Sequence, residues 1–99
     1  MTLYCCSSAL LIPTETDSMR ASSKWDDMSI EKLQAGHQLY VNKCGKCHYL
    51  HRPNRFSEEK WLSKMPDMKL EAKLTDEEID LVTKYILTMR EAVPQQKVK

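Results

Sequence analysis

The sequence predicts an all-α protein with one small folded domain. Only two glycines and seven aromatic residues occur among its 99 residues, which argues against a β-sandwich or a disordered chain. In two stretches the apolar residues recur three and four positions apart, which is the period of one helix face. No run of about eighteen apolar residues is present to predict a transmembrane helix. The formal net charge of +1 gives no reason to expect nucleic acid as a partner.

Residues 1 to 28 are predicted to lie outside the folded domain, as a truncated signal followed by a flexible linker. The apolar run near Met1 lacks the basic start of a secretory signal, since the first basic residue is Arg20. Leu3 stands three residues before Cys6, as in bacterial lipoprotein signals, which predicts a lipid tether on Cys6. Cys5 is the lesser candidate, and ordinary thiols in a tail are the alternative. Residues 13 to 27 show no helical apolar period and indicate a linker.

The folded domain is predicted to span residues 29 to 93 and to begin with a helix capped by Ser29. Its apolar face is formed by Ile30, Leu33, His37, Tyr40 and Cys44. Gly36 lies on or beside this face, where the missing Cβ would let another helix approach closely. The alternative is that Gly36 is only a weak point, costing about 1 kcal/mol relative to alanine.

Two more helices are predicted after a loop that ends near Phe56. The second begins at Ser57 and is limited by Pro66, with residues 67 to 74 as a connection. The third begins at Thr75, because Thr75-Asp76-Glu77-Glu78 fits the capping box. Its apolar residues are Ile79, Val82, Ile86, Met89 and Val93. Pro94 ends the pattern, and residues 94 to 99 are predicted to be a tail.

The stretch Cys44-Gly-Lys-Cys47-His48 carries the chemistry. Two thiols separated by two residues can form thioether bonds to one haem, and the adjacent histidine can then bind its iron. A thiol-disulfide oxidoreductase would need this motif at a strand-to-helix turn, but here a helix precedes it. A zinc site that uses Cys44, Cys47 and either His48 or His51 has suitable ligand types but lacks a clear second ligand pair at a separated spacing. The motif therefore predicts one covalently bound haem c.

One iron position is left by His48, and a methionine thioether commonly fills it. Met68 is the favoured ligand because it follows Pro66, after which a loop would present its sulfur to the haem. Met65 is the alternative ligand, although it is also suited to packing the second helix. If neither methionine binds, the iron stays open, and the protein is instead a haem-based sensor or ligand-binding cytochrome.

These motifs resemble the class I c-type cytochromes over residues 29 to 91. The resemblance depends on the Cys44–His48 motif, on Gly36 and Tyr40 before it, and on Val82 and Tyr85 in the closing helix. It implies three main helices around the haem, with the first and last crossing near Gly36 and Tyr85. Trp61, then Met68 and the run Lys73–Glu78, are similar to small single-haem bacterial cytochromes, in which this methionine is the distal ligand. Pro66-Asp67 departs from their pattern.

The resemblance implies an electron carrier rather than an enzyme, placed in the periplasm or tethered to a membrane facing it. Its redox donor and acceptor are not identified by the sequence. Between residues 42 and 64, six basic residues stand against two glutamates, which predicts a mild positive patch suited to an acidic redox partner. A mixed solvated surface is the more conservative interpretation. Arg52 and Arg55 are candidates to pair with the haem propionates, and Pro53 to offer its carbonyl to His48.

Overall fold

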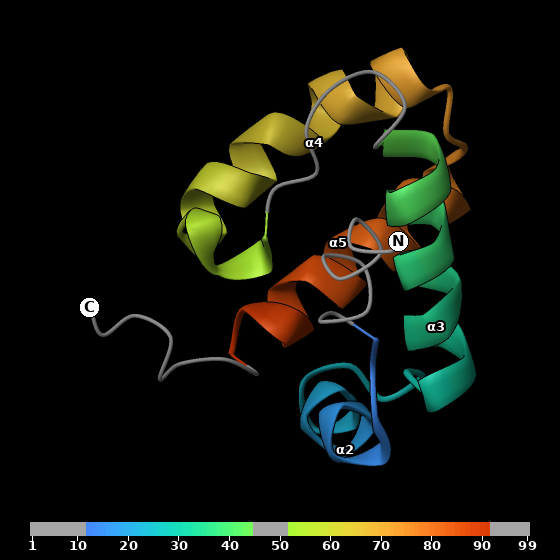
Figure 1. The fold of residues 1–99 in the computed structure, drawn as a ribbon, viewed down its shortest axis with the longest axis vertical. Helices are drawn as coiled ribbons and strands as arrows, with labels where there is room; N and C mark the ends of the chain where they lie inside the picture. The colour runs from blue at the N-terminus through green and yellow to red at the C-terminus, as the bar shows by residue number, and fades with distance from the viewer. Residues whose placement is uncertain (1–11, 45–51, 92–99) are drawn as a thin grey trace, which may run out of the picture.

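The computed structural model describes residues 12–44 and 52–91, and these residues form four helices joined by turns. The all-α prediction is confirmed for this part of the chain, which contains no strand. Figure 1 shows α5 (Asp76–Arg90) in the middle, and the other three helices all contact it. None of the four is long and apolar enough to cross a membrane. One helix more is present than the three main helices that the sequence predicts.

The additional helix is α2 (Glu15–Lys24), so the predicted linker over residues 13–27 is wrong. Thr14 and Asp17 start α2 as a capping box. The Thr14 amide donates to the Asp17 carboxylate at 2.8 Å, and the Asp17 amide donates back to the Thr14 hydroxyl at 3.4 Å. The helix lacks an apolar stripe because its capping and its attachment to the core are largely polar.

Arg20 attaches α2 to the end of α5. Its Nη2 atom donates to the carbonyl oxygen of Thr88 at 2.9 Å and lies 2.9 Å from the carboxylate of Asp17. Residues of this part of the chain also form a small buried apolar cluster, made of Ala21, Met28 and Leu33. The first folded residues therefore precede Ser29, and α2 belongs to the same packed unit as the other helices.

Helix α3 (Ile30–Leu39) begins as predicted, with the Ser29 hydroxyl accepting the amide of Lys32 at 3.2 Å. The predicted continuation of this helix to Cys44 takes a different form. Residues Tyr40–Cys44 form the π-helical turn η2, in which backbone hydrogen bonds join residues five apart instead of four apart as in an α-helix. The helical segment thus leads to the first cysteine of the haem motif, as expected, but with a wider final turn.

Helix α4 (Glu58–Ala72) contains Pro66 in its interior, so the predicted end at Pro66 and the predicted connection from residue 67 are wrong. Proline removes one hydrogen bond to the carbonyl four residues earlier, here that of Leu62. Leu62 and Pro66 lie on the exposed side of α4, where water can bind that carbonyl. The opposite face keeps its apolar spacing across the proline and is formed by Trp61, Met65, Met68 and Ala72.

The end of α4 is set by Lys73, which has the left-handed backbone conformation with φ 58° and ψ 48°. The following amide, that of Leu74, bonds back to the Lys69 carbonyl at 3.0 Å. A left-handed conformation costs a lysine about 1 kcal/mol that glycine avoids. We expect Lys73→Gly to raise the free energy of unfolding by about 0.5 kcal/mol after the entropy lost to glycine, measured in urea at unchanged m-value.

The control is the same replacement at Lys69, inside α4, where glycine is expected to lower the free energy of unfolding by about 1 kcal/mol. A loss of stability at both positions would contradict the left-handed conformation of Lys73.

Helix α5 confirms the predicted capping box at Thr75. The amide of Glu78 donates to the Thr75 hydroxyl at 3.1 Å, and the amide of Thr75 donates to the Glu78 carboxylate at 2.9 Å. The helix ends at Arg90, earlier than the apolar pattern predicts. In the predicted loop before α4, residues Pro53–Arg55 form the 3-10 turn η3, which contacts α5.

Candidate functional site

The described structure reaches the haem motif from both sides but does not include most of it. The helical segment formed by α3 and η2 ends at Cys44. Cys47 and His48 lie outside the described residues, as do Cys5 and Cys6. Within the described ranges, no group of three or more histidine, cysteine or carboxylate side chains is placed to hold a metal ion. The site is therefore built from the elements that flank the motif.

The crossing of α3 and α5 fixes the direction from which the motif is approached. Gly36 on α3 lies against the backbone of Leu81 on α5, so that a Cβ at residue 36 would overlap the carbonyl oxygen of Leu81. The same atom would lie 2.7 Å from Cβ of Tyr85. The expected close approach of the first and last helices at Gly36 and Tyr85 is thus present, and it places Tyr40, one turn later, against α5.

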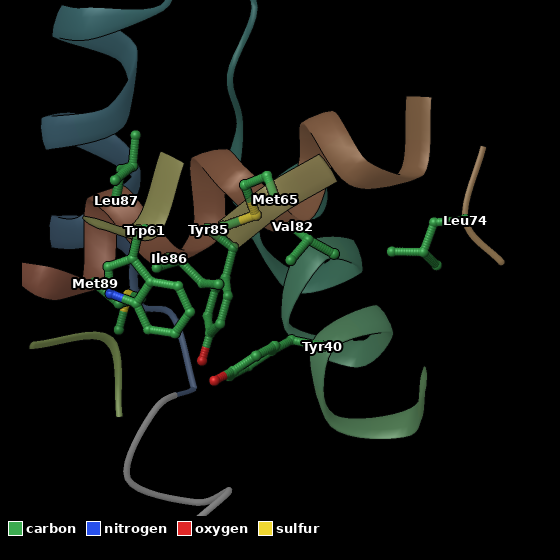
Figure 2. Close-up of a cluster of buried hydrophobic side chains, with 9 residues drawn as sticks. All are labelled: Tyr40, Trp61, Met65, Leu74, Val82, Tyr85, Ile86, Leu87 and Met89. Carbon is green, nitrogen blue, oxygen red and sulfur yellow. The ribbon is translucent and has the colours of Figure 1, made fainter. Parts of the chain in front are cut away.

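Aromatic side chains fill the space beside η2 (Figure 2). The ring of Tyr40 lies 6.3 Å from Trp61 and 6.0 Å from Tyr85, measured between ring centroids. His37 meets Tyr85 edge to face at 5.4 Å and is buried, consistent with a core histidine. Burial, with smaller contributions from Tyr40 and Asp17, raises the pKa of Tyr85 well above its usual range. Tyr85 is therefore neutral at any physiological pH.

Trp61 connects α4 to the segment that follows the motif. Its indole Nε1–H donates to the carbonyl oxygen of Pro53 at 2.7 Å, and both groups are buried. The sequence analysis names the Pro53 carbonyl as a candidate acceptor for His48. It does not reveal Trp61 as a donor to this carbonyl, because Trp61 lies eight residues later in a different element. A carbonyl oxygen has two lone pairs, so the Trp61 bond leaves one for a second donor.

The two candidate methionines lie on the same side of α4. Met65 is 7% exposed and belongs to the main core cluster, while Met68 is half-buried and packs against that cluster. The reason given by the sequence for Met68, a loop after Pro66, is wrong because Met68 lies within the helix. Because α4 contacts η2, both methionines lie on the helix that packs beside the segment leading to Cys44. The choice of Met68 as ligand stays a prediction.

Arg52 and Arg55, the candidates to bind the haem propionates, are both exposed at η3. Arg55 lies over the ring of Phe56 at 5.7 Å from its centroid. Neither guanidinium forms an ion pair with a carboxylate of the described residues, so both remain able to bind an anion.

Comparison with known proteins adds no family assignment. The chain matches no protein-family model, no curated protein and no solved structure. The function must therefore be argued from the motif and from the residues that surround it.

Proposed function

We propose that the chain is a monohaem c-type cytochrome that carries electrons. Cys44 and Cys47 would hold haem c through two thioether bonds, with His48 and Met68 as the iron ligands. The observation that carries this proposal is the Cys-x-x-Cys-His motif at the end of a helical segment. Its support is the close α3–α5 crossing at Gly36, which the family resemblance implies and which composition alone does not predict.

The described residues are suited to such a group. A haem bound by histidine and methionine needs an apolar surround and a thioether sulfur, and the described residues beside η2 include both. Tyr40, Trp61 and Tyr85 form a buried aromatic wall, and Met68 lies half-buried on the helix that contacts η2. The chemistry of the surrounding residues therefore fits a haem edge.

The bound haem would supply a one-electron redox centre. If His48 and Met68 both bind the iron, no iron position would remain for a substrate, so the chain would act as an electron carrier and not as an enzyme. The buried rings of Tyr40 and Trp61 would exclude water, and neutral Tyr85 would add no charge near the iron.

Placement outside the cytoplasm, in the periplasm or on a membrane facing it, is part of the same proposal. It is supported by the covalent haem motif and by the lipoprotein-like spacing of Leu3 and Cys6. If Cys6 carries a lipid, residues 13–27 would not lengthen the tether as predicted, since Pro13 is buried and α2 packs against α5. The folded unit would then stay closer to the membrane than the predicted linker allows.

The test is the visible absorption spectrum of the full chain expressed with a c-type maturation system. We expect a covalent haem spectrum, with the weak long-wavelength band that oxidised haem shows when methionine sulfur is bound. The band should be lost in Met68→Ala and kept in the matched variant Met65→Ala. Met65→Ala should instead lower the free energy of unfolding by about 2–4 kcal/mol, because Met65 is buried.

Other results would change the proposal in defined ways. Loss of the band in Met65→Ala alone would move the ligand to Met65. Covalent haem without the band, with carbon monoxide binding to the reduced form, would favour a sensor or ligand-binding cytochrome. A well-folded protein without haem after expression with the maturation system would contradict the proposal as a whole.

A further inference from the structure

Five cationic residues lie on the elements that meet at Phe56, and together they are named the Phe56 cation cluster. They come from η3, α4 and the end of α5, and they are Arg52, Arg55, Lys60, Lys64 and Arg90. We propose that this cluster is a docking surface for a partner protein with an acidic patch. All five side chains are described, and three of them, Lys60, Lys64 and Arg90, are not among the candidates to bind the haem propionates.

The centre of the cluster is the Phe56 ring. Lys64 Nζ lies 4.7 Å from the ring centroid and Arg55 Cζ lies 5.7 Å from it. Cation–π attraction holds each of these groups at the ring. Two cationic groups are thereby held beside the same ring. The ring therefore presents a concentrated positive charge to the surface.

The other three cations extend this charge. Arg90 Nε donates to the carbonyl oxygen of Phe56 at 2.9 Å, which brings the last turn of α5 to the same place. Lys60 precedes Lys64 by one turn on the same flank of α4. Arg52 precedes Arg55 in η3, where the Arg55 amide bonds to the Arg52 carbonyl at 2.9 Å. The sequence predicts the local excess of charge, but it does not reveal the contribution of Arg90.

Within the described part of the chain, no carboxylate forms an ion pair with the cluster. All 14 aspartate and glutamate side chains lie in the described ranges, and none forms an ion pair with these five cations. The nearby Glu58 pairs instead with Lys24 at 3.6 Å. Elsewhere, by contrast, Lys32, Lys69 and Lys84 each have a carboxylate partner. The positive charge around Phe56 is thus left for an external anion.

The geometry favours carboxylates of a protein over the phosphates of a nucleic acid. The two exposed guanidiniums can each bind a carboxylate through two parallel hydrogen bonds. A nucleic acid gains affinity by contacting many cations along its backbone, whereas here Glu59 and Asp67 are exposed on α4 beside the two lysines. The formal net charge of +1 also gives little long-range attraction to a polyanion.

The experiment is a calorimetric titration of the full chain with a short polyglutamate peptide. The double variant Lys60→Gln/Lys64→Gln is compared with Lys69→Gln/Lys73→Gln, which removes the same charge from the other flank of α4. We expect wild-type binding that weakens from about 0.01 M to about 0.15 M salt. The first variant should bind about fivefold more weakly, and the second should bind as the wild type does.

Three results would overturn the proposal. No binding of the peptide at low salt is the first. Equal weakening in both double variants is the second, since it would show that only net charge matters. Tighter binding of an oligodeoxynucleotide of equal charge, lost in Lys60→Gln/Lys64→Gln, is the third, because it would assign the cluster to nucleic acid.

Discussion

Replacing Gly36 by valine is expected to lower the free energy of unfolding by about 3 kcal/mol or more. A Cβ at this position overlaps the Leu81 carbonyl oxygen and lies 2.7 Å from Tyr85 Cβ, so α3 and α5 must move apart. Neither obstacle can turn away, because one is backbone and the other is fixed by a fully buried ring. Gly36→Ala should cost about 1–2 kcal/mol, despite the gain of about 1 kcal/mol that alanine brings to a helix.

The intrinsic preference for alanine is measured separately at Gln34, an exposed residue of the same helix. There the alanine variant should be more stable than the glycine variant by about 1 kcal/mol, as judged by urea unfolding. An increase of stability in Gly36→Ala, of the size found at Gln34, would show that α3 and α5 do not approach closely in solution. The angle at which α3 crosses α5 on its way to Cys44 would then need another explanation.

Local sequence rules predict this fold well where one segment determines its own structure. The Thr75 capping box and the Ser29 N-cap each satisfy amides a few residues away, and both are present as predicted. The close approach of a second helix at Gly36 is also predicted from the sequence, because a glycine on the apolar face of a helix has few other structural roles. The prediction that the helix ends at Pro66 is wrong. The helix tolerates one missing hydrogen bond on its exposed side, and its buried face continues to Ala72.

Contacts between distant segments were not predictable in the same way. Helix α2 attaches to the core through Arg20 and the Thr88 carbonyl, 68 residues apart, and a search for apolar periods cannot find such a contact. The Phe56 carbonyl and Arg90 are 34 residues apart, and their contact likewise depends on how α5 passes η3. The Thr-x-x-Asp spacing before α2 was the one local signal available.

The candidate site likewise has a part that the sequence predicts and a part that only the structure reveals. The residues that bind haem are proposed from the motif, since covalent attachment needs specific side chains at a fixed spacing. The contacts that support the site are found only in the fold, and the hydrogen bond from Trp61 to Pro53 is the clearest example. Pro53 lies eight residues before Trp61 in a different element, so the hydrogen bond requires both the η3 turn and the correct face of α4.

The second large loss of stability is expected at Trp61, where replacement by alanine should lower the free energy of unfolding by about 4 kcal/mol. The side chain is 1% exposed, and its removal leaves a cavity between Tyr40 and Phe56, whose rings it meets edge to face. Trp61→Phe keeps most of the apolar volume but loses the bond to Pro53. It should cost about 1–3 kcal/mol, because a buried carbonyl loses its donor.

Trp25 provides the matched control for the hydrogen bond. Trp25 is half-buried, and its indole N–H has no hydrogen bond within the described part of the chain. Trp25→Phe therefore removes only ring surface and weakens the cation–π contacts of Lys24 and Lys84 with this ring. We expect a cost below about 1 kcal/mol. Equal losses in Trp61→Phe and Trp25→Phe would show that the bond to Pro53 contributes nothing. A larger loss at Trp61 would identify this bond as the link that holds the segment after the haem motif against α4.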